Sequence, residues 1–227
     1  MLRLIPIALA LAFTSSCAGT KRPDPARFAK DMAKFDAEER SRPPVQGGIV
    51  FTGSSSVRMW KVNEAFPDLP VLNRGFGGSV AHDLVVHAEK VALRYEPALL
   101  VVYTGGNDIH MKLTPEEALE DCTSFLTLVH QRLPQTRVLL HALRTGPVRL
   151  AELPQAEEFN RLLKAWCADK PWVRWFDVPA ALVKESNSPR EEFYLKDRLH
   201  LNAAGYKIWN RDFGPALREE WAKVKAK

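Results

Sequence analysis

The sequence predicts an α/β protein of three layers, in which a five-stranded parallel β-sheet lies between two layers of helices. Short apolar runs recur along the chain, and longer stretches with helical periodicity and capping signals separate them. Strands that alternate with helices form parallel sheets, and the helices then cover both faces. The length of 227 residues suits one domain, and 46% hydrophobic with 26% charged residues is ordinary for a globular protein.

Five of the apolar runs have the length and the boundaries of strands. The expected strands are Ile49–Thr52, Val71–Asn73, Ala98–Tyr103, Val138–Ala142 and Val173–Asp177. In open parallel sheets, ligands bind outside the carboxyl ends of the strands. Polar residues that directly follow these runs are therefore the first candidates for a functional site.

Helix start signals support the segments between and before the strands. Asp24 followed by Pro25 is a typical N-cap with proline at the first helical position. Phe28, Met32 and Phe35 follow at helical spacing, and we expect this apolar stripe to pack on the domain rather than to bind a partner.

Later segments carry similar signals. Thr114 begins a capping box with Pro115 at the first helical position. A further helix is expected over about 154–168, and a last one from Ala203 towards the end of the chain. Its large apolar residues are expected in the core: Tyr206, Trp209, Phe213, Leu217 and Trp221.

Three consecutive serines, Ser54, Ser55 and Ser56, follow the first strand and Gly53. A strand that ends in a tight turn and enters a helix leaves a serine hydroxyl exposed at the helix N-terminus. Backbone N–H groups and the helix dipole favour developing negative charge there. Each serine is a candidate nucleophile, although a serine at this place can also simply cap the helix.

Three further blocks offer complementary groups. Gly77 and Gly78 follow the second strand, and glycines let the backbone approach a ligand closely. Asn107 follows the third strand, and its amide can donate a hydrogen bond without carrying charge. Asp197 lies three residues before His200, so one short turn can supply a base and the carboxylate that orients it. Each block alone also fits an ordinary turn, but their order favours one catalytic constellation.

These blocks resemble those of the SGNH (GDSL-type) hydrolase family, from about residue 48 to the C-terminal helix. The resemblance implies that Ser55, at the position of the serine in the G-D-S block, is the nucleophile. Asp197 and His200 would complete the triad. The oxyanion hole would consist of Ser55, Gly78 and Asn107.

The resemblance also implies a flavodoxin-like strand order, and it includes one departure. Ser54 replaces the usual aspartate of the first block, which gives G-S-S-S and places the chain in a subgroup. Because that aspartate is not a member of the triad, the departure does not affect the implied mechanism.

The implied activity is that of a serine esterase without metal or organic cofactor. Short loops at 109–112 and 143–147 are expected to wall the site, and they contain no long apolar lid. We therefore expect short acyl groups, and an O-acetylated glycan is a reasonable substrate for an exported protein. The alternatives are a lysophospholipase or thioesterase, an acyltransferase with the same residues, and an exported binding protein without turnover.

Composition and motifs argue against several other classes. The net charge of +5 is mild, and no basic stripe or nucleic-acid module is present, so we expect no nucleic-acid partner. The chain lacks the second glycine of G-x-S-x-G, and it has no H-E-x-x-H or P-loop. Arg58 stands where an S-x-x-K pairing with Ser55 would need lysine, and His110 is expected to be a wall residue rather than a metal ligand.

The N-terminus has the features of a targeting segment. A short positive start precedes the apolar run Leu4–Phe13, which is too short to span a bilayer as a lasting helix. Thr14–Cys17 resembles a bacterial lipobox, although ordinary signal cleavage is an alternative. We therefore expect lipidation of Cys17, membrane association through that anchor, and a location in the bacterial cell envelope facing the periplasm.

The expected division of the chain follows from these observations: 1–17 is a lipoprotein-type signal peptide, 18–46 an N-terminal helix with linker, and 47–227 the SGNH hydrolase domain. Besides Cys17, the chain contains Cys122 and Cys167, both on expected helices that flank one strand. An exported protein can join such a pair in a disulfide, and two buried thiols are the alternative.

Overall fold

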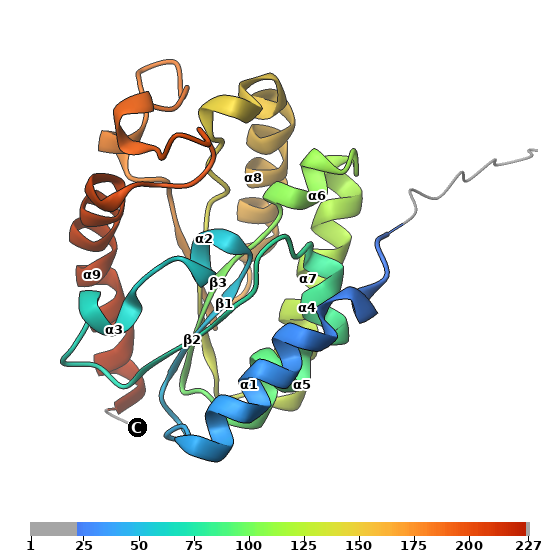
Figure 1. The fold of residues 1–227 in the computed structure, drawn as a ribbon, viewed down its shortest axis with the longest axis vertical. Coiled ribbons are helices and arrows are strands. Elements are labelled where there is room, and N and C mark those ends of the chain that lie inside the picture. Colours follow the sequence, from blue (N-terminus) through green and yellow to red (C-terminus); the bar gives the residue numbers. More distant parts are fainter. Residues whose placement is uncertain (1–21, 226–227) are drawn as a thin grey trace, which may run out of the picture.

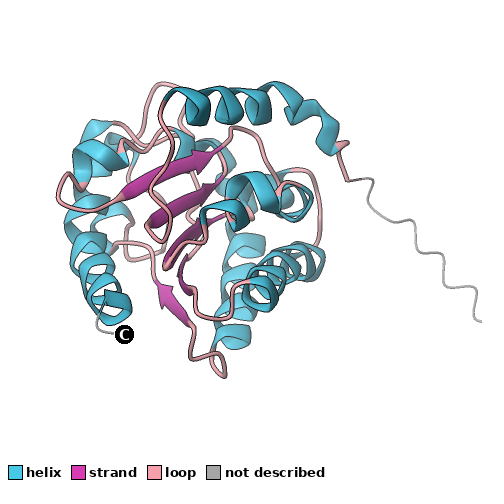
Figure 2. Cartoon of the chain, turned by 90° about the horizontal axis from the view of Figure 1, so that it is seen from below, coloured by secondary structure: helices cyan, strands magenta, loops and turns pink. Residues whose placement is uncertain are grey.

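A computed structural model describes residues 22–225, so the signal segment with Cys17 lies outside the described residues. The chain forms one sheet of five parallel strands in the order β2-β1-β3-β4-β5 (Figures 1 and 2). The strands are β1 (Ile49–Gly53), β2 (Val71–Gly75), β3 (Leu99–Tyr103), β4 (Arg137–His141) and β5 (Val173–Phe176). The predicted fold class and flavodoxin-like order are confirmed, and each strand begins and ends within two residues of its expected bounds.

Helices fill the connections between the strands. The α-helices are α1 (Ala29–Ser41), α2 (Ser55–Arg58), α3 (Val62–Ala65), α4 (Ala81–Val86), α5 (Ala88–Val91), α6 (Gly106–His110), α7 (Pro115–Arg132), α8 (Leu153–Cys167) and α9 (Ala203–Lys225). Short 3₁₀ helices occur at η1 (Pro25–Phe28), η2 (Leu93–Tyr95), η3 (Pro147–Glu152), η4 (Ala180–Leu182) and η5 (Glu191–Phe193). The capping box of α7 is present: Thr114 Oγ1 accepts from the Glu117 N–H at 3.2 Å, and the Glu117 carboxylate accepts from the Thr114 N–H at 2.8 Å.

Helices α7 and α8 pack together on one side of the sheet, and α9 lies on the other (Figure 1). Beneath α9, Trp209 and Phe213 contact Trp60 at ring-centroid distances of 4.9 and 5.5 Å. Burial in this aromatic cluster lowers the pKa of His141 to about 3, so its imidazole is neutral. The predicted core role of the α9 stripe is confirmed, with Leu217 also buried and Tyr206 and Trp221 packed against the core.

The N-terminal helix is part of the same core. Phe28, Met32 and Phe35 are buried, as expected from their spacing. The Phe28 ring meets Phe76 edge-on at 4.8 Å, directly before the glycine block that follows β2. The segment before the first strand therefore supports a loop of the site.

Cys122 and Cys167 are both buried and both free, so the two-thiol alternative describes the structure. Among residues 22–225, no helix combines the length and the apolar character that crossing a membrane would require.

The strand register brings the site blocks together. Gly53 pairs with Gly75 on one side and with Tyr103 on the other, so β1, β2 and β3 end at the same level. The serine block, the glycine block and the asparagine block leave the sheet from these three ends. They are therefore neighbours in space although the chain separates them.

Candidate active site

Ser55 is the first residue of α2, and its hydroxyl contacts His200. The distance between Ser55 Oγ and His200 Nε2 is 2.7 Å. Gly53 makes this turn possible because its φ is +140° and a Cβ there would lie 2.0 Å from the Tyr103 carbonyl oxygen. A short helix therefore begins at the edge of the sheet with its first hydroxyl facing the imidazole.

The neighbouring serines are placed differently. The Ser56 hydroxyl accepts a hydrogen bond from Arg144 at 3.2 Å, and its carbonyl accepts one from Tyr206 at 2.7 Å. Ser54 is buried at the N-cap of α2. Of the three serines, Ser55 is the one within hydrogen-bonding distance of His200.

The Asp197 carboxylate holds His200 from the other side. Asp197 Oδ2 lies 2.7 Å from His200 Nδ1, and Oδ1 accepts from the N–H groups of Leu199 and His200 at 2.9 and 3.0 Å. Burial raises the pKa of Asp197, but these hydrogen bonds together outweigh it and lower that pKa to about 2. Asp197 is therefore a carboxylate at neutral pH and fixes a proton on Nδ1 of the imidazole.

The turn that carries this pair has an unusual backbone. Arg198 has φ of +56°, a left-handed conformation that costs a non-glycine residue roughly 1–2 kcal/mol. The loop after β4 packs against it: the Val148 N–H donates to the Arg198 carbonyl at 3.0 Å, and a Cβ at Gly146 would lie 3.0 Å from that same oxygen. The glycine at 146 thus permits the close approach of the two loops.

The backbone N–H groups of Ser55 and Gly78 have no acceptor in the part of the chain described. Gly78 has φ of +84°, a conformation that favours glycine. Asn73 of β2 donates to the carbonyls of Val57 and Trp60 at 2.7 and 2.8 Å, which ties α2 and its serine block to β2. Unused donors beside a nucleophile are what an oxyanion hole requires.

The side-chain amide of Asn107 lies at the same place. Its Nδ2 donates to the Ser79 carbonyl at 2.9 Å, which leaves its second hydrogen available. Its Oδ1 accepts from Arg149 Nη1 at 3.1 Å, and the same nitrogen donates to the Gly106 carbonyl at 2.9 Å. All residues predicted for the triad and the oxyanion hole therefore gather at one edge of the sheet.

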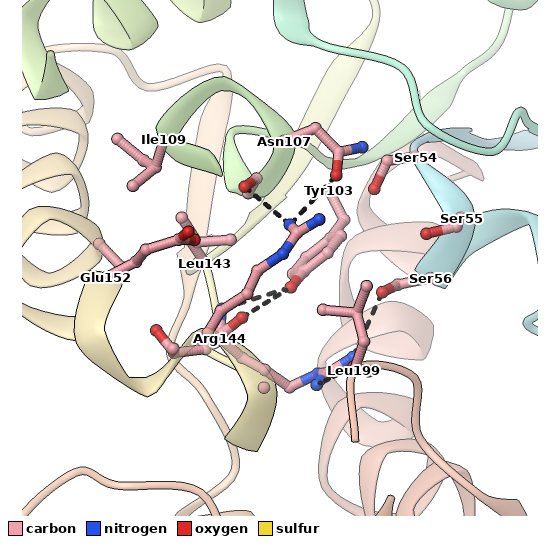
Figure 3. A pocket seen from close by; sticks show the side chains of 15 residues that line it. Ser54, Ser55, Ser56, Tyr103, Asn107, Ile109, Leu143, Arg144, Glu152 and Leu199 are labelled. Atoms are coloured by element: carbon pink, nitrogen blue, oxygen red, sulfur yellow. Dashed lines mark hydrogen bonds between the residues drawn. The ribbon is translucent and has the colours of Figure 1, made fainter. Parts of the chain in front are cut away.

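Sequence reasoning missed one arginine of the site, Arg149, and expected another, Arg144, only as part of a loop that walls the site. Arg149 belongs to η3, which has no periodic pattern, and Arg144 belongs to the loop after β4. Arg144 is buried and extends towards Ser56 and the Leu199 carbonyl, at 3.2 and 3.3 Å (Figure 3). It thus joins the serine block to the turn that carries His200.

Asp108 is a further buried group that the sequence did not assign. Its Oδ1 accepts from the Ala81 N–H at 2.9 Å, while its Oδ2 is buried without a partner. Burial is the main cause that raises the pKa of Asp108 to about 7. The carboxyl group ties α6, which carries Asn107, to the start of α4 after the glycine block.

Ser55 lies between two hollows. The first is a small cavity of about 40 Å³ that Tyr103, Ile109, Leu143 and Arg144 help to line (Figure 3). The second is an open depression of about 400 Å³ that His200 helps to line. Its other lining residues are Asp31, Ser55, Arg58, Gly77, Gly78, Asn107, Arg149 and Leu199.

His110, predicted to be a wall residue, lines neither hollow, but it contacts Glu152, which lines the small cavity. Its Nδ1 lies 2.7 Å from Glu152 Oε1, and about half of its side chain is exposed. Within residues 22–225, no cluster of three or more His, Cys, Asp or Glu side chains is arranged to hold a metal ion.

Residues 50–208 match the family model of the GDSL-like lipase/acylhydrolase family. No curated protein matches the chain. Among solved structures, it is similar to a GDSL-like lipase from Bacteroides thetaiotaomicron, with 18% identity, a TM-score of 0.70, and coverage of 86% of this chain and 98% of that one. It is also similar to an acetylxylan esterase from Geobacillus stearothermophilus, with 17% identity, a TM-score of 0.60, and coverage of 78% and 95%.

A third similar structure is a carbohydrate esterase family 3 protein from Talaromyces cellulolyticus, with 14% identity and a TM-score of 0.63. The similarity covers 81% of this chain and 99% of that one. At these identities, the three structures support the fold, and the family model supports the class of chemistry.

Proposed function

The chain belongs to the GDSL-like lipase/acylhydrolase family and is a hydrolase that acts on esters, and from this premise we propose that it removes acetyl groups from O-acetylated glycans by serine catalysis. The observation that carries the proposal is the hydrogen-bonded chain from Ser55 through His200 to Asp197, with both distances at 2.7 Å.

In the proposed reaction, Ser55 Oγ attacks the ester carbonyl carbon while His200 Nε2 takes its proton. Asp197 keeps the proton of Nδ1 in place and stabilises the imidazolium. His200 then returns the proton to the leaving alcohol, and the acyl group remains on Ser55. Water, deprotonated by His200, attacks the acyl-enzyme; the bond from the acyl carbon to Ser55 Oγ then breaks, His200 returns the proton to Ser55 Oγ, and the carboxylic acid leaves.

The oxyanion of both tetrahedral intermediates would accept hydrogen bonds from the N–H groups of Ser55 and Gly78 and from Asn107 Nδ2. The two backbone donors have no other acceptor in the part of the chain described, and Asn107 has one hydrogen to spare. These donors exist in place before the charge develops, and loss of one such donor typically costs roughly 10²–10³-fold in turnover.

The two hollows favour an assignment of the ester's two halves. His200 must protonate the leaving alcohol, and it helps to line the open depression but not the small cavity. The alcohol therefore belongs in the depression and the acyl group in the cavity of about 40 Å³. A cavity needs about 10–15 Å³ to hold one water molecule. The small cavity therefore has room for about three groups of that size, which suits an acetyl group.

The open depression has room for a large alcohol such as a sugar within a chain. This agrees with the names of two similar structures, an acetylxylan esterase and a carbohydrate esterase. Membership of the G-S-S-S subgroup stays a prediction, as do the residue roles given above.

The test is hydrolysis of p-nitrophenyl acetate, butyrate and octanoate and release of acetate from acetylated xylan. The soluble chain from residue 18 is compared with Ser55→Ala, with Ser54→Ala as the matched control. We expect acetate to be preferred and activity to vanish only in Ser55→Ala. Octanoate preference would favour a lysophospholipase or thioesterase, transfer to an added alcohol would favour an acyltransferase, and no turnover by folded protein would favour a binding protein.

We also propose that Cys17 is lipidated and anchors the domain at the bacterial envelope, facing the periplasm. The proposal depends on the lipobox-like segment alone. Labelling of cells with a fatty-acid analogue tests it: the wild-type chain should be labelled and Cys17→Ser should not. A wild-type chain that is exported without label would contradict it.

A further inference from the structure

The arginines around Ser55 differ from most others in the molecule. Elsewhere, arginines such as Arg74, Arg94 and Arg218 form ion pairs with carboxylates. Among the described residues, Arg58 and Arg149 have no ion-pair partner, and both line the open depression beside Ser55. Unpaired guanidinium groups at a substrate site are available to bind an anion.

Arg58 is exposed at the end of α2, one turn after Ser55. Its guanidinium packs over the backbone of Gly77, because a Cβ at that position would lie 2.8 Å from Arg58 Nε. Gly77 does not have a positive φ, so its backbone conformation does not itself require glycine. The missing side chain instead leaves the space that the Arg58 guanidinium occupies.

Arg149 lines the same depression from a different element, η3. Its Nη1 donates to the Gly106 carbonyl and to Asn107 Oδ1. Its Nη2 donates to no acceptor among residues 22–225. Burial lowers the pKa of Arg149, and the nearby charge of Glu152 only partly opposes this, as expected for a guanidinium without a direct carboxylate contact.

We propose that Arg58 and Arg149 bind a carboxylate on the alcohol part of the substrate, so that the preferred substrate is an O-acetylated acidic glycan such as one that contains uronic acid. This inference rests on the proposed esterase function, because it assigns the alcohol to the depression. Asp31 lines the same depression. Apart from the triad residues, the lining therefore carries two positive charges, on Arg58 and Arg149, and one negative charge, on Asp31.

A sugar suits this depression better than a lipid. Its lining is made of charged and polar side chains and glycines, and Leu199 is the one large apolar residue among them. A phospholipid would bring an anionic phosphate, but its acyl chain would have to enter the cavity of about 40 Å³. An acidic sugar brings the anion without a long chain.

The test compares two substrates that differ in one group: a mono-O-acetyl methyl glucuronoside and the corresponding glucoside. We expect the wild type to prefer the acidic ester by about tenfold in kcat/KM, since each exposed charge-assisted contact contributes a factor of about three. In Arg58→Gln the ratio should fall to about threefold. Arg40→Gln is the matched control, and its ratio should match that of the wild type. Arg40 lies on the last turn of α1, which leads to the amino end of β1, whereas Ser55 follows the carboxyl end of that strand.

A binding measurement separates this inference from the esterase proposal. The acetylated glucuronoside is titrated into Ser55→Ala, with and without Arg58→Gln. Binding that depends on Arg58, without hydrolysis by the wild type, would support the anion site and contradict the esterase.

The reverse outcomes overturn the inference. Hydrolysis of both sugars with a ratio near one, or a ratio unchanged in Arg58→Gln, would remove the anion site and leave the esterase intact. A stronger preference for acetylglycerol phosphate than for the glucuronoside would overturn the acidic glycan in favour of a phosphate-bearing alcohol. Absence of binding to Ser55→Ala would also overturn it.

Discussion

Arg149 fixes the orientation of the Asn107 amide, because Arg149 Nη1 donates to Asn107 Oδ1 at 3.1 Å. With the oxygen held on that side, Asn107 Nδ2 must point the other way, where it donates to Ser79 at 2.9 Å. The nitrogen, and not the oxygen, is thereby presented to the proposed oxyanion. The guanidinium charge also polarises the amide and makes Nδ2 a better donor.

Arg149→Met is therefore expected to lower kcat about tenfold, because the amide loses its orientation and its polarisation. KM for p-nitrophenyl acetate should change little, since the oxyanion forms only after attack. Steady-state kinetics check this, with Arg149→Lys as the variant that keeps the charge and should recover part of the loss. A rise in KM at unchanged kcat would contradict the role.

Asp197→Asn is expected to leave the fold intact and to lower kcat by about 10⁴-fold, because an amide stabilises the wrong tautomer of His200. The carboxylate lies near the surface, so unfolding midpoints should remain close to the wild-type value. Kinetics and a thermal melt check both parts. Unchanged turnover would exclude Asp197 from the triad.

Asp108 predicts an unusual pH dependence of stability. Its native pKa of about 7 lies above the unfolded value of 3.8. Between these pH values the native state binds the extra proton, so this group makes stability fall as pH rises. In Asp108→Asn that decrease should be absent. The free energy of unfolding of the variant minus that of the wild type should therefore increase from pH 5 to pH 8, by on the order of 2 kcal/mol.

Denaturant unfolding at both pH values measures this difference. His141 titrates in an overlapping range, but its contribution is common to both proteins and cancels in the subtraction. A difference that is independent of pH would mean that Asp108 is already ionised in the folded protein.

Leu143 lines the small cavity and is almost fully buried, so it should limit acyl length. Leu143→Ala is expected to enlarge the cavity and to move the preference from acetate towards butyrate, by about tenfold in the ratio of kcat/KM. The chain-length series with p-nitrophenyl esters checks this. An unchanged ratio, with the variant folded, would mean that the acyl group lies elsewhere.

The sheet and the main site residues could be predicted because each has a local signal. The strands are apolar runs with clear boundaries, and Ser55, Gly78, Asn107 and His200 occur in short recognisable blocks. Arg149 has no such signal, since its contact with Asn107 joins a loop after β4 to a helix after β3.

The backbone of the triad turn is a similar case. Arg198 adopts a left-handed conformation that its residue type does not favour, and the contact with the Gly146 loop imposes it. The helices α2 to α6 are also too short for a period to be read from their residues. In each case the deciding interaction comes from a distant part of the chain.

The most direct test of the nucleophile is the site of covalent modification by a fluorophosphonate, located by tandem mass spectrometry of the wild-type chain. An activated serine displaces fluoride and keeps the phosphonyl group. The account predicts one adduct, on Ser55, and none in Ser55→Ala. An adduct on Ser54 or Ser56, or no adduct on the folded protein, would contradict the assignment of Ser55.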